Sequence, residues 1–324
     1  MKATATAYSN NALIKYWGRS NSSLRLPENN SISVNLSGLK TVTTVEFSKK
    51  IEKDDININD RSLRAVERVV SHINRIRKLA GIKLPVKVVS RNNFPSSTGL
   101  SSSASAFASL TLAGTSALGL RLEESRLSSL ARLASGSACR SIPGGFTEWK
   151  KGNNHKNSLA YTIFPPEYFQ IADIVAVLSY QKKKIPTSQA QNYARSSPFF
   201  QSRLKNLPGK IKNLKNAIQK KDFSQFGRLV EAEALELHSI ILTSTPPVIY
   251  LLPETVSLIN LVGQWRNKGL EVYFTLNTGH NLHLLCLKKD LTRLLKQLEN
   301  VSFIKKLLVN FPAGASFINN NHLF

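Results

Sequence analysis

The residues best placed to do chemistry lie between positions 93 and 106, which read Asn-Phe-Pro-Ser-Ser-Thr-Gly-Leu-Ser-Ser-Ser-Ala-Ser-Ala. This segment connects a strand expected over Val86–Val89 to a helix of small residues expected over Ala104–Leu118. Small side chains let backbone N–H groups approach an anion, and the positive end of the following helix attracts negative charge. Serine hydroxyls add donors and can help to hold a magnesium ion beside a phosphate. The segment therefore predicts a phosphate-binding loop.

Spacing alone leaves a second explanation for this loop. It is not a Walker loop, because Gly-Lys-Ser/Thr is missing, and it is not a dinucleotide-binding Gly-x-Gly-x-x-Gly turn. A polar turn followed by a packed, alanine-rich helix would have the same composition, since serine-rich turns are common. The rest of the chain has to decide between the two.

The composition is that of a globular protein with a strong attraction for anions. The chain has 324 residues, of which 42% are hydrophobic, and this length suffices for one large or two ordinary domains. Its 44 basic and 20 acidic residues give a net charge of +24, which attracts nucleotides, phosphorylated metabolites or nucleic acid. Basic runs such as 182–184 have no interleaved aromatic residues, so we expect exposed surface charge there and no specific nucleic-acid site.

Neither a membrane span nor a disulfide framework is expected. No apolar run approaches the ~18 residues that cross a bilayer, and the segment 1–7 lacks the apolar core of a secretory signal. The chain has two cysteines, Cys139 and Cys286. We therefore expect a cytoplasmic protein in a reducing compartment.

Hydrophobic periodicity predicts alternating strands and helices, followed by a second group of strands around helices. The strands expected first are Lys2–Tyr8, Ser31–Leu36, Thr41–Phe47, Ile56–Ile58 and Leu84–Ser90, with helices at Ser62–Ala80, Ala104–Leu118 and Leu122–Ala134. The later strands are Ile171–Leu178, Leu270–Leu276 and His283–Leu287, with helices at Gln201–Lys220, Phe223–Thr243 and Glu254–Lys268. This order indicates an α+β protein with a boundary near residue 170.

Three blocks of the chain, in the same order, resemble the mevalonate diphosphate decarboxylase family of the GHMP kinase superfamily. They are the loop at 93–106, Asn11-Ala12-Leu13-Ile14-Lys15-Tyr16-Trp17-Gly18, and Ser135-Gly136-Ser137-Ala138-Cys139-Arg140-Ser141. Similarity continues through Thr243-Ser244 and 275–281, so it spans nearly the whole chain. The resemblance implies a two-domain GHMP kinase fold, with a ribosomal protein S5 domain 2-like domain over 1–170 and a ferredoxin-like domain over 171–324.

The reaction of that family uses ATP and Mg²⁺ to phosphorylate the 3-hydroxyl of 5-diphosphomevalonate, and loss of this phosphate with carbon dioxide gives isopentenyl diphosphate. The resemblance implies that Lys15 lies near the reacting hydroxyl and that Arg140 holds the substrate carboxylate, for which its planar fork is suited. The implied substrate contacts are Asn11, Tyr16, Arg19, Ser137, Ser141, Thr187 and Ser188. The implied ATP contacts are Asn93, Pro95, Gly99, Leu100, Ser101, Ser102 and Ser103, and Ser103 is also the candidate magnesium ligand.

Some of these residues have a second possible role. Asn11 either orients the neighbouring lysine or contacts substrate, and Tyr16 either contacts the diphosphate or packs in the core. Asn93 either reaches the nucleotide or caps its own turn. On the first long helix, Arg61 or Arg64 is a further candidate for the diphosphate.

The largest departure from the family lies at its catalytic carboxylate. Where the family has Thr-x-Asp-Ala-Gly-Pro-Asn, residues 275–281 of this chain read Thr-Leu-Asn-Thr-Gly-His-Asn. Asn277 therefore stands at the aspartate position that the resemblance marks as catalytic, and an amide cannot take a proton from the 3-hydroxyl.

Three interpretations of Asn277 remain open. Asn277 only orients the hydroxyl, and the proton leaves late, to a phosphate oxygen or to His280. Alternatively the substrate is phosphomevalonate or a 3-phosphorylated mevalonate, or the chain is an inactive paralogue. Our first hypothesis is decarboxylation of diphosphomevalonate, ahead of phosphomevalonate decarboxylation, mevalonate 3-phosphorylation and a non-catalytic binding protein. The expected partners are ATP, a phosphorylated mevalonate and a second copy of the chain, without nucleic acid or membrane.

Overall fold

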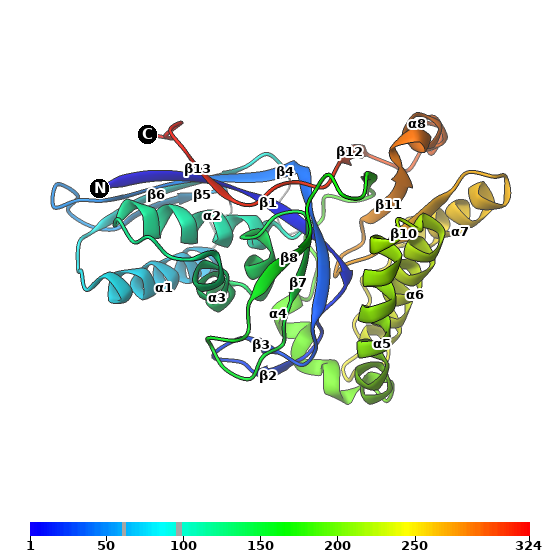
Figure 1. The fold of residues 1–324 in the computed structure, drawn as a ribbon, viewed down its shortest axis with the longest axis horizontal. Helices are drawn as coiled ribbons and strands as arrows, with labels where there is room; N and C mark the ends of the chain where they lie inside the picture. The colour runs from blue at the N-terminus through cyan, green and yellow to red at the C-terminus, as the bar shows by residue number, and fades with distance from the viewer. Residues whose placement is uncertain (60–62, 95–98) are drawn as a thin grey trace.

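The computed structural model describes residues 1–59, 63–94 and 99–324, which form two lobes around a pair of sheets (Figure 1). The sheet of the first lobe has the strand order β13-β1-β4-β6-β5, and β7 and β8 extend it from β4. Its strands are β1 (Lys2–Ile14), β4 (Ser31–Phe47), β5 (Asp55–Ile58), β6 (Val86–Asn92), β7 (Phe146–Trp149), β8 (Ala160–Phe164) and β13 (Phe317–Asn319). A small hairpin of β2 (Arg19–Asn21) and β3 (Leu26–Pro27) lies apart from this sheet. The expected mixture of strands and helices is confirmed.

The long strand β4 replaces the two strands expected on either side of residue 38. Its pairing with β1 passes from Tyr8–Lys40 directly to Ser9–Leu36, so residues 37–39 form a bulge. A bulge bends a strand and increases its twist without ending it. The backbone N–H of Gly38 donates to Asn310 Oδ1 at 3.1 Å, which ties the bulge to the second lobe. The expectation of two separate strands was therefore wrong.

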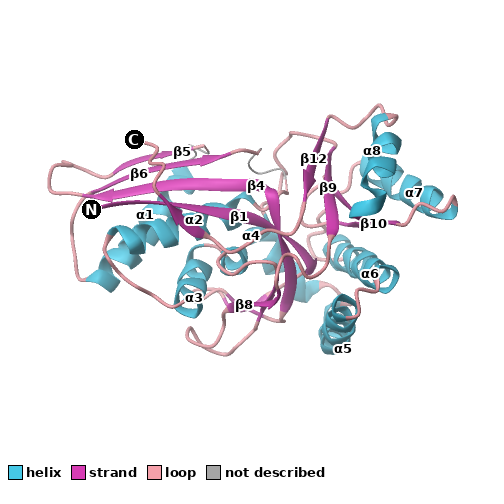
Figure 2. Ribbon diagram, turned by 45° about the horizontal axis from the view of Figure 1, so that its top comes forward, coloured by secondary structure: helices cyan, strands magenta, loops and turns pink. Residues whose placement is uncertain are grey.

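Three helices cover one face of the first sheet (Figure 2). They are α1 (Leu63–Ala80), α2 (Ser102–Ala117) and α3 (Glu124–Ala134), and Ser62, the expected first residue of α1, lies outside the described residues. Phe107 and Leu110 of α2 pack in one core with Val45 and Val88 of the sheet. A 3₁₀ helix, η1 (Gly136–Ser141), follows α3 and carries the serine-rich block of the sequence.

The sheet of the second lobe is buried on both faces. Its order is β10 (Val272–Thr275), β11 (Leu282–Leu287), β9 (Ile171–Val177) and β12 (Lys306–Asn310), with every neighbouring pair antiparallel. Alternate residues of a strand point to opposite faces. Val175 accordingly joins the core shared with the first lobe, whereas Ile174 and Ala176 join a second core. The surrounding helices are α5 (Phe200–Gln219), α6 (Phe223–Leu242), α7 (Pro253–Asn267) and α8 (Leu291–Glu299).

The end of the chain returns to the first lobe, so the two termini lie close together (Figure 1). After β12 the chain crosses back, and β13 pairs antiparallel with β1 through Thr4–Asn319 and Thr6–Phe317. The segment that follows residue 310 therefore belongs to the first sheet, although a division of the sequence at 170 assigns it to the second half. Periodicity did not indicate β7, β12 or β13, because such short strands carry too few residues to show an alternation.

No helix within the described residues combines the length and the hydrophobicity needed to cross a bilayer.

The aromatic core between the lobes should carry much of the stability. Phe226 of α6 is fully buried, and its ring lies 5.4 Å from that of Phe169 and 6.0 Å from that of Phe223, measured between centroids. Phe226→Ala is expected to lower the free energy of unfolding by about 3–5 kcal/mol in urea titration, because it removes a buried ring and leaves a cavity. Phe199→Ala, at a side chain that is 51% exposed, is the matched control and should change it by less than about 1 kcal/mol. Equal losses in both variants would contradict this assignment of the core.

Candidate active site

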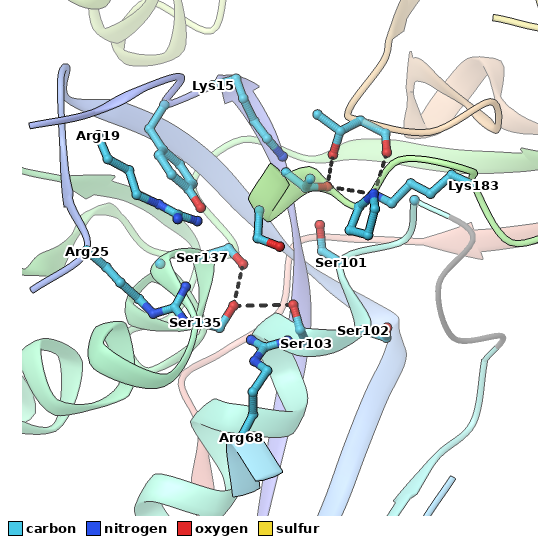
Figure 3. A pocket seen from close by; sticks show the side chains of 17 residues that line it. Lys15, Arg19, Arg25, Arg68, Ser101, Ser102, Ser103, Ser135, Ser137 and Lys183 are labelled. Carbon is cyan, nitrogen blue, oxygen red and sulfur yellow. Dashed lines mark hydrogen bonds between the residues drawn. The ribbon is translucent and has the colours of Figure 1, made fainter. Parts of the chain in front are cut away.

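A cleft lies where the loop before α2, the 3₁₀ helix η1, the end of β1 and the segment 183–188 meet (Figure 3). Its basic lining residues are Lys15, Arg19, Arg25, Arg68 and Lys183. Its lining residues with hydroxyl groups are Tyr16, Ser101, Ser102, Ser103, Ser135, Ser137, Thr187, Ser188 and Thr278. Within the described residues no carboxylate lines the cleft, so its electrostatic field is suited to a ligand with several negative charges.

The N-terminus of α2 opens into this cleft. Ser101, the residue before the helix, has a left-handed backbone with φ of 55°, and its side chain caps no N–H group. The first-turn donors of a 16-residue helix are thus directed at the space between Ser101, Ser102 and Ser103. The loop expected to bind phosphate therefore has the geometry that anion binding requires.

Gly99 brings the phosphate loop against the turn that contains Asn277. Its φ is +96°, and a Cβ built at this position would lie 3.0 Å from the Cα of Gly279. A side chain at position 99 would therefore be strained in its backbone and would also push the two loops apart. The two motifs, about 180 residues apart in the sequence, meet glycine against glycine.

Three serines form a connected cluster on the floor of the cleft. Ser103 Oγ lies 3.2 Å from Ser135 Oγ, which lies 3.5 Å from Ser137 Oγ (Figure 3). Magnesium prefers oxygen ligands and keeps several waters and phosphate oxygens in its coordination sphere. Hydroxyl groups next to an anion site fit such an ion, and no group of His, Cys, Asp or Glu within the described residues forms a metal site of its own. The residues present therefore fit a magnesium ion that arrives with a nucleotide.

Lys15 is fixed at both its backbone and its side chain. Its carbonyl oxygen accepts hydrogen bonds from Arg203 Nη2 at 2.9 Å and from Asn29 Nδ2 at 3.1 Å. Arg203 is itself buried and paired with Glu233 of α6. At the other end, Lys15 Nζ donates to Asn277 Oδ1 at 2.6 Å. The lysine is 6% exposed and is therefore presented to the cleft by rigid surroundings.

The protonation of Lys15 is sensitive to its surroundings. Burial holds the pKa of Lys15 well below its usual value, and the positive charges of Arg140 and Lys183 lower it further. Its side-chain partner, Asn277, is neutral and does not oppose these effects. A bound anion in the cleft would raise this pKa again, because an opposite charge favours the ammonium form.

Arg140 lies behind the wall of the cleft. It is 1% exposed, and its guanidinium donates to Ser31 Oγ at 2.7 Å and to Asn10 Oδ1 at 3.1 and 3.4 Å. The ring of Tyr16 lies 5.6 Å from the guanidinium carbon. Among the described residues no carboxylate lies within 4 Å of Arg140. The guanidinium is therefore a buried charge that neutral partners alone surround.

Other expected substrate contacts divide between the lining and its support. Arg19, Ser137, Thr187 and Ser188 line the cleft. Tyr16 does so too, and its ring also packs edge-on against Trp149 with 4.6 Å between centroids, so both of its suggested roles are present in the structure.

Two expected contacts lie beneath the surface of the cleft. Ser141 is fully buried and accepts a hydrogen bond from Asn10 Nδ2 at 2.7 Å, which shapes the turn around Arg140. Asn11 is also fully buried, and its side chain bridges Asn277 and Asp173. Neither residue lines the cleft.

The expected nucleotide contacts are also divided. Asn93 holds the bulge of β4, since its Oδ1 accepts from the N–H of Lys40 at 2.9 Å and its Nδ2 donates to the carbonyl of Gly38 at 2.9 Å. Leu100 is 3% exposed and joins the core between the lobes. Pro95 and Arg61 lie outside the described residues, and so does the side chain of Arg64.

His280 does not face the cleft. It is 6% exposed, and its Nε2 lies 3.0 Å from the carbonyl oxygen of Ser179. Burial lowers the pKa of His280 from its ordinary value.

Sequence reasoning missed Lys183, Arg25 and Arg68 as lining residues. Lys183 Nζ donates to Thr187 Oγ1 at 2.6 Å and to the carbonyl of Thr278 at 2.7 Å, so it joins two loops across the cleft (Figure 3). In the sequence it stands in the middle of a run of three lysines that reads as surface charge. Burial lowers the pKa of Lys183 to about 8. Its closeness to the Thr-Ser pair at 187–188 was the available signal.

Two family models match this chain over most of its length. Residues 7–160 match the diphosphomevalonate decarboxylase-like N-terminal domain. Residues 173–319 match the mevalonate 5-diphosphate decarboxylase C-terminal domain.

Individual relatives agree with these models. A diphosphomevalonate decarboxylase of Candida albicans is 35% identical over 300 residues, which cover 86% of this chain and 82% of the relative. A phosphomevalonate decarboxylase of Haloferax volcanii is 32% identical, with 88% of each chain covered. The crystal structure of mevalonate diphosphate decarboxylase from Staphylococcus aureus has a TM-score of 0.92 at 35% identity and 98% coverage of both chains. A further structure, described as MDDEF in complex with MVAPP, AMPPCP and magnesium, has a TM-score of 0.92 at 34% identity and 99% coverage of both. The expected GHMP kinase fold is thereby confirmed.

The charge of the cleft should depend on pH through Lys183. Since its pKa is about 8, the cleft loses a positive charge as the pH rises through that value, and its affinity for an anion falls. Isothermal titration calorimetry with inorganic diphosphate, between about pH 7 and about pH 9, should show a steeper loss of affinity for the natural protein than for Lys183→Arg, which stays charged. Lys184→Arg, at the exposed neighbour, should behave like the natural protein. Parallel curves for all three would show that Lys183 does not titrate in the cleft.

Proposed function

Since this chain belongs to the diphosphomevalonate decarboxylase family, we propose that it catalyses the ATP-dependent decarboxylation of (R)-5-diphosphomevalonate. The products are isopentenyl diphosphate, ADP, phosphate and carbon dioxide. ATP and Mg²⁺ are required, in line with the related structure in complex with AMPPCP and magnesium.

The observation that carries this proposal is positive charge without a carboxylate partner. Lys15 and Arg140 are buried and Lys183 is half-buried, yet within the described residues no Asp or Glu lies within 4 Å of any of them. Keeping charges out of water is costly unless an opposite charge compensates them. A substrate with one carboxylate and two phosphates, beside a nucleoside triphosphate, supplies that compensation.

Each end of the substrate then has a partner. We assign Arg140 to the carboxylate, because each of its terminal nitrogens carries two N–H groups and the hydrogen bonds in the described residues use one of each. Arg19, Lys183, Thr187 and Ser188 are assigned to the diphosphate. The N-terminus of α2 and Ser101–Ser103 are assigned to the phosphates of ATP, with Ser103 beside the magnesium ion, which supplies charge neutralisation when bound.

The chemical sequence follows from these positions. The 3-hydroxyl oxygen attacks the γ-phosphorus, and ADP leaves. The C3–O bond then breaks with departure of phosphate, the C1–C2 bond breaks with release of carbon dioxide, and its electron pair forms the C2=C3 double bond. Lys15, held beside Asn277, stabilises negative charge at the transferring oxygens.

The proton of the 3-hydroxyl needs no strong base in this scheme. Asn277 Oδ1 already accepts a hydrogen bond from Lys15, so the amide orients the lysine and, with it, the hydroxyl. Phosphoryl transfer through a loose transition state depends mainly on positioning and charge neutralisation. The proton therefore leaves late, to a phosphate oxygen, since His280 is directed away from the cleft.

Phosphomevalonate is the second candidate substrate. The observation that favours it is the Haloferax volcanii relative named phosphomevalonate decarboxylase, which covers the same share of this chain as the diphosphate-specific names do. The same cationic cleft would hold one phosphate in place of two.

We also propose that the protein acts in the cytoplasm as a homodimer. Both cysteines are buried and free, as suits a reducing compartment. Light scattering on the purified chain tests the dimer, and a mass of one chain, 35.9 kDa, would exclude it.

The substrate is identified by measuring ATP-dependent release of phosphate and of carbon dioxide with four compounds. Diphosphomevalonate should give both products in equal amounts and with the highest kcat/KM. A higher kcat/KM with phosphomevalonate would instead select the second candidate. ADP formation from mevalonate without carbon dioxide would indicate a 3-kinase, and ATP-independent turnover of 3-phosphomevalonate alone would indicate an altered substrate. Absence of turnover with all four would mark an inactive paralogue.

Arg140→Lys tests the assigned carboxylate contact. Lysine keeps the charge but loses the planar, bidentate fork, so kcat/KM is expected to fall by about 10²-fold or more. Arg126→Lys, on the exposed side of α3, is the matched control and should leave kcat/KM within about twofold. An unchanged kcat/KM in Arg140→Lys would remove the guanidinium from the mechanism.

A further inference from the structure

A continuous chain of side-chain hydrogen bonds runs from the cleft into the interior between the lobes. Lys15 Nζ donates to Asn277 Oδ1 at 2.6 Å, and Asn277 Nδ2 donates to Asn11 Oδ1 at 2.6 Å. Asn11 Nδ2 then donates to Asp173 Oδ2 at 2.6 Å, and Asp173 Oδ1 lies 2.8 Å from His283 Nδ1. The five residues come from β1, β9, β11 and the turn after β10, and each is less than 7% exposed. We call this chain the amide relay.

The direction of every bond in the amide relay is set by Asp173. A carboxylate only accepts, so the end of Asn11 that faces Asp173 must be its NH₂ group. The other end of Asn11 is then its oxygen, which requires the NH₂ group of Asn277. Asn277 is left with its oxygen toward Lys15, where an ammonium group needs an acceptor.

A flipped amide would disrupt the site. If Asn277 turned over, its NH₂ group would face the ammonium of Lys15, and two donors would meet without an acceptor. An asparagine by itself has no preference between the two orientations, because its oxygen and nitrogen ends are nearly equal in shape. A partner that only accepts, placed two amides away, supplies the preference.

We propose that Asp173 is a positioning residue of the reaction, and that through Asn11 it fixes which atom of Asn277 faces Lys15. The negative charge that the family keeps at position 277 is thus placed in this chain at 173, where His283 supports it, and its effect reaches the cleft through two amides. The catalytic part of this inference rests on the proposed function, whereas the hydrogen-bond directions do not.

The decisive experiment exchanges the carboxylate and the amide at the two ends. In Asn277→Asp, carboxylates lie on both sides of Asn11, whose single NH₂ group can serve only one of them. In the double variant Asp173→Asn with Asn277→Asp, Asn11 turns over, donates to the new aspartate and accepts from the new asparagine. The relay is then complete again with its direction reversed, and an oxygen still faces Lys15.

The stability of the four proteins tests the relay without any assay of activity. Asn277→Asp alone should raise the equilibrium constant of unfolding by about tenfold or more, and adding Asp173→Asn should bring it back to within about threefold of the natural value. Asp290→Asn, which removes a carboxylate outside the relay, is the control second substitution and should restore nothing. If the losses at 173 and 277 simply add, the two positions are not coupled and the proposal is wrong.

Turnover tests the positioning role. Asp173→Asn is expected to lower kcat by about tenfold with KM for ATP within about twofold, because the relay contacts Lys15 and not the nucleotide loop. The double variant should recover kcat to above that of either single variant, which lost packing alone would not produce. A natural kcat in Asp173→Asn, or a double variant no better than the poorer single one, would overturn the proposal.

Two arrangements keep these outcomes interpretable. If Asp173→Asn does not fold, Asn11→Ala interrupts the relay and leaves the Asp173–His283 pair in place; Asn277→Asp should then raise its kcat, since a carboxylate presents an oxygen to Lys15 in either orientation. If the natural protein turns over none of the substrates, the proposed function fails, while the unfolding measurements still decide the relay.

Discussion

The structure depends on keeping the Lys15 ammonium buried at the junction of the two lobes and facing an acceptor. Its backbone carbonyl is held by Arg203 and Asn29, and its side chain by Asn277. These contacts come from α5, from the loop between β3 and β4, and from the turn after β10. A shift of any one of these segments would move the ammonium, so the geometry of the cleft requires both lobes to be packed against each other.

The means of supporting buried charge differ between the two sides of this junction. Below Lys15, Arg203 is neutralised by Glu233, an ion pair that needs no ligand. On the cleft side, Lys15 and Arg140 face amides and hydroxyls, which orient a cation but leave its charge uncompensated. The first arrangement is structural, and the second is completed by an anion. The excess of basic residues over the whole chain acts in the same direction, because it raises the local concentration of anionic substrates.

Glycine and serine at the mouth of the cleft serve the same requirement for close approach. Gly99 lies against Gly279, and Ser101 has the left-handed backbone that starts α2, so backbone donors are exposed where side chains would otherwise block them. The two loops that contact here belong to different lobes, which places the nucleotide end of the cleft beside Asn277. Phosphoryl transfer depends on this proximity, since it is governed by positioning more than by acid–base strength.

The sequence by itself determined the α+β order of elements, the phosphate loop and the family, because each of these is written in local patterns: periodicity, small residues before a helix, and three ordered blocks. It also located Lys15, Arg140 and Asn277 in those blocks. Only the tertiary structure decided that Lys183 lines the cleft, that Asn93 holds a bulge of β4, and that Asp173 and His283 stand behind Asn277. Hydrogen bonds between strands more than a hundred residues apart leave no local pattern, so these partners become visible only when the two lobes are packed together.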